Sequence, residues 1–504
     1  MNWSHLLVQF TPELAVLVTA VWVILSDLFL SRHPSGLWRQ CFLGLAAATI
    51  GAAFLYQVPT PGVELPAIIT RVLLVSPLTS SLKFVVLLLS TLAVVFSYRS
   101  FEETERHAGE YYSLILFSVL GGLLCISSQD LVLFFISFEL LSLPLYMLCG
   151  FRRYNSASAE AGLKYFVNGA LSSALMLYGI SWIYGSLGST HLPTLAANYA
   201  VVPSPPSGFL VGCLLVLSGL GFKVAVAPFH TWAPDVYSGA PPAVSTFLAS
   251  APKVTIVGFI LRLFWQSLDG TGQFFNLPVD WVFLFTVLAA GSMFVGNLSA
   301  LPQQDVRKIF AYSGIAQIGY IFLGLAACNN PHPQQSFSAV LFYTTVYGIS
   351  NLGAWAVLAV LARGQERFDL DSLRGLHQRN PALAACLALC LMSLAGVPPL
   401  SGFMGKFYLF RAIYESGLPF LVVLGILNSV ISLFYYFKVL KAAYFVEAED
   451  GGTSFLQAPS AGPALPMVQQ LAFQLCLWSN VVLGLWPAVI GEVERVASTI
   501  TQGS

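Results

Sequence analysis

Four charged residues stand inside apolar stretches of this chain, where charges are otherwise scarce. Glu139 lies in "FFISFELLSLPL", Lys223 in "LGFKVAVAPF", Lys253 in "ASAPKVTIVG" and Lys406 in "GFMGKFYLF". Desolvation makes any buried lysine release its proton more readily, and a nearby carboxylate opposes this effect. Arginine cannot serve in this way because it stays charged. The residue types therefore predict proton transfer among buried lysines, with Glu139 as a counter-charge.

Other polar residues in apolar surroundings are weaker candidates for this chemistry. Lys164 lies a few residues inside its apolar stretch, so its side chain could either take part or extend to the membrane surface. His230 could link lysines through water or could be a satisfied core histidine. We expect Lys83 to lie near a helix turn or at a packing interface, and Asp235 to cap the following turn.

The elements that hold these residues must be membrane-spanning helices. Only 9% of the 504 residues are charged and 57% are hydrophobic, whereas soluble domains carry roughly a quarter charged residues. The mean hydropathy is +0.76. The composition predicts an all-α integral membrane protein, and the net charge of zero gives no attraction for nucleic acid. The first apolar run lacks a basic leading region, so we do not expect a removable signal peptide.

Apolar runs of about 20 residues, the length that crosses a bilayer, recur along the whole chain. Their spacing predicts about 14 transmembrane helices and no soluble domain between them. We place them near residues 12–30, 37–56, 72–96, 111–127, 130–150, 160–187, 208–235, 241–266, 279–300, 306–328, 336–362, 382–412, 417–444 and 467–490.

Two of the predicted spans contain helix breakers beside a lysine. The seventh carries Gly219, Gly221 and Pro228 close to Lys223, and the twelfth reads "LAGVPPLSGFMGKF" and contains Lys406. Broken backbone at membrane depth is tolerated where it is enclosed by protein or lines a hydrated cavity. Paired interruptions in two halves of a chain are typical of transporters built from inverted repeats. A proline kink that only serves packing is the alternative for each.

Basic residues are concentrated in the odd-numbered loops, among them Arg39, Arg152, Arg153, Arg374 and Arg379. Because cytoplasmic loops carry the excess of lysine and arginine, this pattern predicts both termini on the non-cytoplasmic side.

The eight cysteines are scattered through apolar runs without a CxxC or Cys/His cluster. We therefore expect neither an iron–sulfur nor a zinc site, and no cofactor or metal bound by this chain.

Five long motifs resemble the antiporter-like membrane subunits of respiratory complex I, the NADH-quinone oxidoreductase family. In chain order they are "FELLSLPLYML", "AGLKYFVNGALSSALMLYG", "GFKVAVAPFHTWAPDVYSGAP", "QDVRKIFAYSGIAQIGY" and "AGVPPLSGFMGKFYLF". The form "PFHTWAPDVYSGAP" is similar to the N-type subunit rather than to its L- and M-type relatives. One position departs from the pattern, because Ser76 stands before "PL" where an aspartate is expected.

The resemblance implies two inverted five-helix repeats, each with a broken helix. It divides the chain into helices 1–3 (1–110), a first repeat (111–266), a second repeat (267–446) and a C-terminal loop and helix (447–504). It also implies that Glu139 pairs with Lys223, that Lys253 is the central relay and that Lys406 lies near the exit. Lys164 matches a lysine of the sixth helix in this subunit type.

The function implied by the resemblance is proton translocation in the membrane arm of an NADH:quinone or ferredoxin:quinone oxidoreductase. Quinone and NADH or ferredoxin would be used by the whole complex, whose other subunits would include L- and M-type antiporter-like and small K-type partners. The membrane would be a bacterial inner membrane or a thylakoid membrane. A subunit of a multisubunit cation/proton antiporter is the alternative function, and a purely structural membrane subunit is a third.

Overall fold

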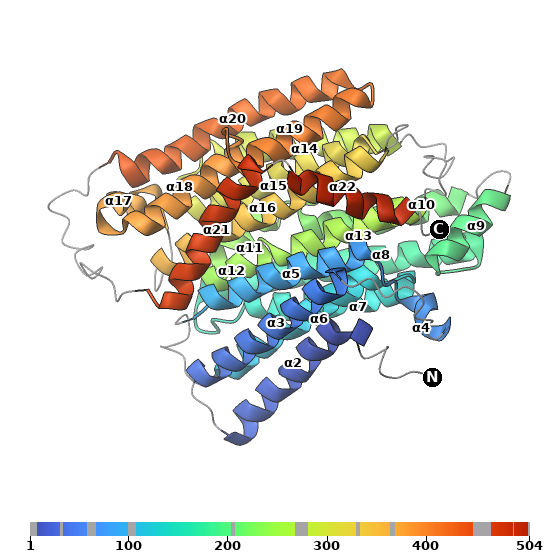
Figure 1. Ribbon diagram of the computed structural model, residues 1–504, viewed down its shortest axis with the longest axis horizontal. Helices are drawn as coiled ribbons and strands as arrows, with labels where there is room; N and C mark the ends of the chain where they lie inside the picture. Colours follow the sequence, from blue (N-terminus) through green and yellow to red (C-terminus); the bar gives the residue numbers. More distant parts are fainter. Residues whose placement is uncertain are drawn as a thin grey trace.

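The computed structural model describes residues 8–30, 34–57, 67–98, 107–202, 207–267, 281–328, 333–362, 368–446, 465–486 and 488–501. These residues are arranged as a helical bundle without strands, which confirms the predicted all-α class. Figure 1 shows α20 along the upper edge of the bundle and α2 along the lower edge, with α13 and α16 between them.

Thirteen of the described helices are long and apolar enough to cross a membrane. Twelve of them are α2 (Thr11–Leu30), α3 (Pro34–Gln57), α5 (Pro77–Phe96), α6 (Ala108–Ser127), α7 (Leu131–Cys149), α8 (Ser156–Leu187), α10 (Ser207–Val224), α14 (Trp281–Ala300), α15 (Val306–Ala326), α16 (Pro333–Leu361), α20 (Pro419–Tyr444) and α21 (Met467–Leu485). The other is formed by α12 (Pro242–Leu248) and α13 (Ala251–Ser267) together. The predicted twelfth span is divided into the shorter α18 (Pro381–Ala395) and α19 (Ser401–Glu415).

Shorter helices complete the described chain. They are α4 (Ala67–Val72), α9 (Leu192–Val201), α11 (Ala233–Gly239), the 3-10 turn η2 (Leu370–Leu373), α17 (Leu376–Arg379) and α22 (Ala488–Thr501). The centre of the bundle is α16, which packs against α12, α13, α15, α18, α19 and α21. The candidate site is built around this helix and its neighbours.

Side-chain caps fix where the site-bearing helices begin. Asp130 caps α7 by accepting hydrogen bonds from the backbone N–H groups of Val132 and Leu133, which satisfies donors that the first helical turn leaves free. Glu139 therefore lies about 13 Å along α7 from this cap. Ser76 caps α5 by accepting from the N–H of Thr79 at 3.2 Å, so serine meets the capping need at the position where the sequence pattern departs.

Both predicted interruptions are confirmed, and their freed backbone groups are satisfied by the protein. In the first, between α10 and α11, the indole of Trp232 donates to the carbonyl of Phe222 at 3.0 Å. The N–H of Ala227 in the same break donates to Ser292 Oγ at 2.9 Å. In the second, between α18 and α19, Gln317 donates to the carbonyl of Leu394 at 2.9 Å. Of the three predicted breakers, Gly219 and Gly221 remain helical, whereas Pro228 lies in the break, which follows Val224.

A third interruption divides the predicted eighth span, which sequence reasoning treated as continuous. It separates α12 from α13 at Ala249 and Ser250, directly before Pro252 and Lys253. Proline has no N–H to donate to the carbonyl four residues earlier, and that carbonyl, on Leu248, accepts from the Tyr237 hydroxyl at 3.2 Å. The Asn351 amide donates to the next carbonyl, on Ala249, at 2.8 Å. The signal in the sequence was Pro252.

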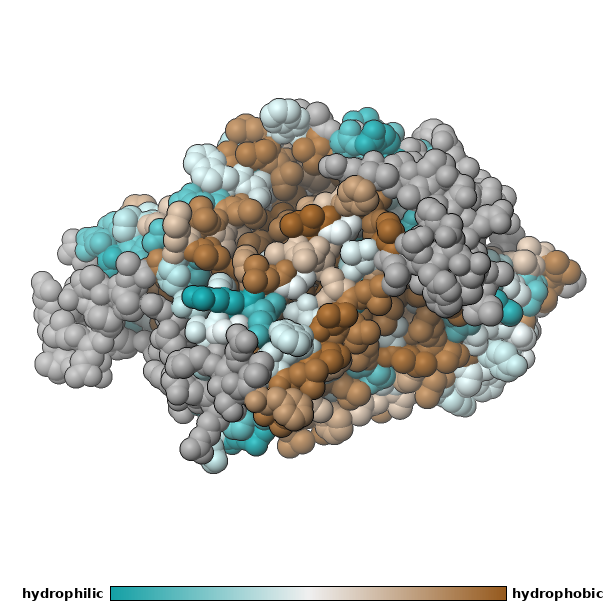
Figure 2. Space-filling model, turned by 60° about the horizontal axis from the view of Figure 1, so that its bottom comes forward, coloured by the Kyte–Doolittle hydropathy of each residue, from teal (hydrophilic) through white to brown (hydrophobic). Residues whose placement is uncertain are grey.

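The outer helices expose apolar side chains over wide areas. With the lower edge of the bundle turned forward, Figure 2 shows brown, apolar surface in a broad band across the molecule. Val18, Trp22 and Phe29 on α2 and Ile50 on α3 are among the exposed large side chains. Such a surface requires a lipid environment or neighbouring membrane proteins, in agreement with the predicted multi-pass membrane protein.

Candidate functional site

Lys223 ends inside a cage of aromatic rings. It is the next-to-last residue of α10 and is 3% exposed. Its ammonium lies 5.7 Å from the ring centre of Phe138, 5.1 Å from that of Tyr146 and 5.0 Å from that of Tyr165. Within the described residues, its nitrogen has no hydrogen-bond partner. Ring faces attract a cation only weakly compared with a carboxylate, so this site holds a lysine without a fixed counter-ion.

Glu139, the expected partner of Lys223, is oriented toward a different group. It accepts a short hydrogen bond from Ser173 Oγ on α8. Among the described residues, no ion pair within 4.0 Å joins Glu139 to Lys223. The side chain is half-buried and follows the exposed face of α7 that carries Ile136 and Leu143. Lys223 thus reaches the rings of Phe138 and Tyr146 on α7, the helix that carries Glu139, without forming a closed pair with Glu139.

Lys253 follows the third interruption and is 4% exposed. Its ammonium donates to the hydroxyl of Tyr347 on α16 at 3.2 Å and lies 5.4 Å from the ring centre of Tyr237. Asn351 also donates to the Tyr347 hydroxyl, at 3.1 Å. Gly314 on α15 leaves the room for this arrangement, because a Cβ there would lie 3.1 Å from the Lys253 nitrogen. The partners of this lysine are therefore neutral.

Lys406 lies in the second turn of α19, after the second interruption, and is 4% exposed. Its ammonium donates to the carbonyl of Ala395, the last residue of α18, at 3.1 Å and to Ser429 Oγ at 3.0 Å. The ring centre of Tyr320 lies 4.5 Å away. The C-terminal end of a helix carries partial negative charge, which favours a cation. The broken helix thus supplies the carbonyl acceptor for the lysine that follows it.

Hydroxyl and amide groups lie between Lys253 and Lys406, and sequence reasoning did not predict this polar set. Tyr343 and Tyr347 are one turn apart on α16 and share a face. Tyr343 donates a short hydrogen bond to Gln317, whose amide donates to the Tyr436 hydroxyl at 3.2 Å. The hydroxyl of Ser429, bonded to Lys406, donates to that of Tyr320 at 3.2 Å. The ring of Tyr320 faces the Lys406 ammonium.

Lys164 and His230 stand apart from the deep lysines. Lys164 is 41% exposed and forms ion pairs with Glu160 and Asp235, each at 2.7 Å. Asp235 therefore binds a lysine of α8 instead of capping a turn, and the ion-paired lysine lies at the surface of the bundle. His230 is half-buried in the first interruption. Within the described structure, no hydrogen bond or ion pair joins it to a lysine.

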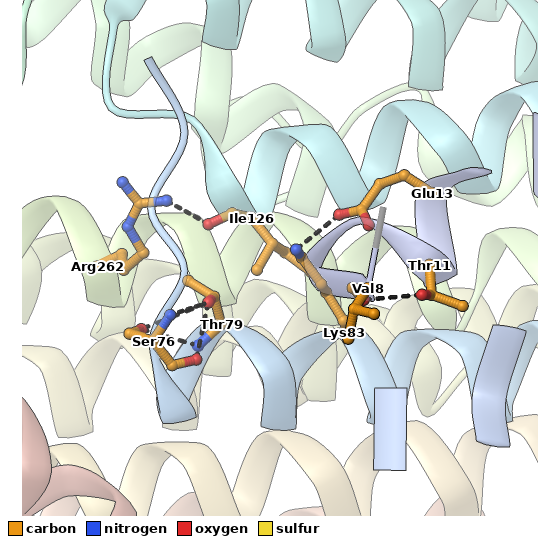
Figure 3. A network of polar contacts seen from close by, with 8 residues as sticks. All are labelled: Val8, Thr11, Glu13, Ser76, Thr79, Lys83, Ile126 and Arg262. Carbon is orange, nitrogen blue, oxygen red and sulfur yellow. Dashed lines mark hydrogen bonds and ion pairs between the residues drawn. The ribbon is translucent and has the colours of Figure 1, made fainter. Parts of the chain in front are cut away.

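Lys83 is also buried, in the second turn of α5. Its ammonium forms an ion pair with the Glu13 carboxylate at 2.6 Å, and the two side chains are 4% and 7% exposed. Figure 3 shows this contact between α5 and α2. These five lysines thus fall into two groups, since Lys83 and Lys164 have carboxylate partners and Lys223, Lys253 and Lys406 have neutral ones.

A bundle of membrane-spanning helices, with buried lysines at two broken helices and at a proline-interrupted one, defines an antiporter-like membrane protein. Residues 128–432 match the family model described as "NADH:quinone oxidoreductase/Mrp antiporter, TM". The chain belongs to this family.

Curated relatives and solved structures agree with the family model over nearly the whole chain. NADH-quinone oxidoreductase subunit N 2 of Acidobacterium capsulatum is 38% identical, over 93% of this chain and 95% of that one. F(420)H(2) dehydrogenase subunit N of Methanosarcina mazei is 34% identical, over 98% and 99%. A chain of respiratory complex I from Thermus thermophilus has a TM-score of 0.77 at 30% identity, covering 95% of this chain and 98% of that one. A chain of the Mrp complex from Dietzia shares the fold, with a TM-score of 0.83 at 21% identity over 100% and 98%.

Proposed function

We propose that this chain is the N-type membrane-arm subunit of a proton-translocating quinone oxidoreductase and moves protons through Glu139, Lys223, Lys253 and Lys406. One observation carries the proposal: the three deep lysines are almost fully buried and face rings, hydroxyls and a carbonyl rather than carboxylates. A lysine that is charged at all times is costly in such surroundings. A lysine that alternates between its charged and neutral forms is suited to them.

The proposed mechanism begins at Glu139. Quinone reduction in other subunits changes the position of its carboxylate relative to Lys223, and an ammonium that loses its counter-charge releases a proton. The proton moves through water to Lys253, whose hydrogen bond to Tyr347 holds the amine in place. It continues to Lys406, and the tyrosine, glutamine and serine side chains between the two lysines provide hydrogen-bonding groups for water. Lys164 and His230 have lesser roles, and Lys164 with its two carboxylates serves as a surface charge cluster near Lys223.

Architecture and assembly follow from the same proposal. Residues 111–266 and 267–446 form the inverted repeats, each containing one of the two predicted broken helices. The partners are L- and M-type antiporter-like subunits and a small K-type subunit in an inner or thylakoid membrane, with both termini on the non-cytoplasmic side. Redox cofactors reside in other subunits, and the electron donor is NADH, ferredoxin or another reduced carrier.

Replacing Lys223 by arginine tests the relay, because arginine keeps the positive charge and does not release its proton. We expect Lys223→Arg to assemble and to lower the number of protons translocated per electron, because loss of one proton-transfer group slows transfer through this chain by roughly 10²–10⁴-fold. Proton uptake by membrane vesicles during substrate oxidation gives this ratio. The exposed Lys441, changed to arginine, is the matched control. Unchanged stoichiometry in assembled Lys223→Arg would contradict the relay.

The multisubunit cation/proton antiporter remains the second candidate, supported by the fold shared with the Mrp chain. Mass spectrometry of the proteins that co-purify in mild detergent separates the two functions. Iron–sulfur proteins together with other antiporter-like subunits would support the oxidoreductase. Small antiporter subunits without a redox protein would support the alternative.

A further inference from the structure

The ion pair between Glu13 and Lys83 is buried and lies outside the proposed relay, so the relay does not explain why these two charges are present. Glu13 is in the first turn of α2 and Lys83 is in the second turn of α5. Both helices pack against α3 and α6, so the ion pair reaches across this layer. Figure 3 shows the carboxylate and the ammonium pointing toward one another.

Stability does not account for this ion pair. Burying two charges has a desolvation cost that is offset only where good geometry and further hydrogen bonds accompany the pair, and apolar replacements of similar volume are often neutral or stabilising. Here both Glu13 carboxylate oxygens are buried and, within the described residues, have no hydrogen-bond partner apart from the Lys83 ammonium at 2.6 Å. A buried ion pair without supporting hydrogen bonds is better suited to fixing the register of the helices that carry it.

The helix that Lys83 belongs to packs directly on the helices that hold the central lysine. The methyl groups of Leu82 lie 3.0 Å from where a Cβ of Gly258 on α13 would be. A Leu89 methyl lies 2.8 Å from the corresponding point at Gly348 on α16. Leu82 therefore fills the space that Gly258 leaves on α13, and Leu89 fills the space that Gly348 leaves on α16. Helix α5 thus packs closely on both helices. A rotation or shift of α5 would move α13 and α16 relative to one another.

We propose that the Glu13–Lys83 ion pair is a positioning element for the Lys253–Tyr347 contact. It fixes the height and rotation of α5, and the leucines of α5 then set α13, which carries Lys253, against α16, which carries Tyr347 next to Gly348. Glu13 and Lys83 touch no group of the relay and act through this packing. The inference rests on the proposed function, because it concerns the geometry of the proposed central lysine.

The test uses the complete membrane complex with four variants: Glu13→Gln, Lys83→Met, both changes together, and the exchange Glu13→Lys with Lys83→Glu. The readouts are the amount of assembled complex, protons translocated per electron and the pH profile of translocation. We expect the doubly neutral variant to assemble, since it leaves no unpaired charge, and to translocate protons up to about a hundredfold more slowly, the loss that a misplacement of about 1 Å can produce. The exchange variant should recover translocation and the pH profile.

Three outcomes would overturn the inference. Normal translocation and an unchanged pH profile in the assembled doubly neutral variant would limit the pair to a structural role. An exchange variant that assembles and translocates no better than the doubly neutral one would show that the interaction itself does not position the site. If Leu82→Ala and Leu89→Ala assemble and translocate normally, the packing route is wrong. Lys253→Ala separates the two proposals. If the Lys253→Ala complex translocates protons normally, the proposed function has failed. If Lys253→Ala loses translocation while the Glu13 and Lys83 variants translocate normally, only the present inference is refuted.

Discussion

At the residue scale, the lysines of this bundle are distinguished by what surrounds their ammonium groups. Lys83 and Lys164 have carboxylates at 2.6 and 2.7 Å, so each ammonium has a counter-charge in contact with it. Lys253 and Lys406 have hydroxyl and carbonyl acceptors, and Lys223 has rings. Neutral surroundings allow both protonation states, which a proton relay requires. Residue type alone did not separate these groups.

The narrow space beside Lys253 gives a prediction that leaves every titratable group in place. In Gly314→Ala, the new methyl would lie 3.1 Å from the Lys253 nitrogen and 3.4 Å from the Tyr347 oxygen. We expect it to displace the ammonium from the hydroxyl and to lower proton translocation by about tenfold, since small misplacements of reacting groups are costly. Translocation per electron in vesicles is the measurement.

A matched glycine serves as the control for this substitution. A Cβ at Gly185 on α8 would have no heavy atom within 4 Å. Gly185→Ala should therefore translocate normally, with stability unchanged or slightly raised. Equal behaviour of the two alanine variants would show that the space beside Lys253 is not critical.

At the element scale, each deep lysine lies where a helix is interrupted. Lys223 precedes the first break, Lys253 follows the break at Pro252, and Lys406 follows the second predicted break. An interruption frees carbonyl groups that bind a cation or polar side chains at membrane depth. The Ala395 carbonyl accepts a hydrogen bond from the Lys406 ammonium, and the Ala249 carbonyl accepts one from the Asn351 amide. The backbone carbonyls at the breaks thus become polar partners inside the bundle. In a continuous helix they would be used by the helix's own hydrogen bonds.

The amide of Asn351 tests this view of the third interruption. Asn351→Ala leaves the buried carbonyl of Ala249 without its donor and removes the bond to the Tyr347 hydroxyl. We expect a loss of stability of about 1–3 kcal/mol, the cost of leaving a buried polar group unpaired, together with weaker proton translocation. Thermal unfolding of the purified complex measures the first effect.

The control for Asn351→Ala is an amide at the surface. Gln470 is exposed, and its amide donates to the Leu465 carbonyl at 2.8 Å, where water can replace the lost bond. Gln470→Ala should change stability by only a few tenths of a kcal/mol. If Asn351→Ala were as mild, water would have to reach Ala249, and the interruption would not be sealed by protein.

At the scale of the whole molecule, the apolar outer surface determines where the chain can reside. Val423, Val430 and Phe434 on α20 are exposed large apolar side chains, as are those on α2 at the opposite edge of Figure 1. Between these edges, α13 and α16 are shielded from lipid. The polar contacts of the site are therefore confined to the interior, where the dielectric is low and electrostatic interactions are strong.

A lysine placed on this outer surface should disturb the protein in the membrane. Val430 lies near the middle of α20 and is 49% exposed. Val430→Lys should lower the amount of inserted chain, because a charge near the bilayer centre costs about 2.5–3.5 kcal/mol on insertion scales. Val430→Leu is the apolar control, and the inserted fraction is measured by membrane fractionation. Normal insertion of the lysine variant would indicate that this face meets polar groups of another subunit.

The sequence was sufficient for the features that depend on local composition. Apolar runs located the spans, and glycine and proline located two of the interruptions, because hydropathy and missing N–H groups act within a few residues. Pro252 also signalled the third interruption, but we predicted one continuous span there because the residues around Pro252 are apolar. The five motifs predicted the family that the comparisons later confirmed.

The tertiary structure alone decided which groups meet. Glu13 and Lys83 are 70 positions apart, Lys253 and Tyr347 are 94 apart, and no local pattern connects them. Whether Lys223 contacts Glu139 or aromatic rings, and whether Tyr320 packs or faces an ammonium, depends on helix rotation within the bundle. Rotation is set by packing among many helices at once, so the sequence determined the spans and the residue types, while the packed bundle determined the partner of each charge.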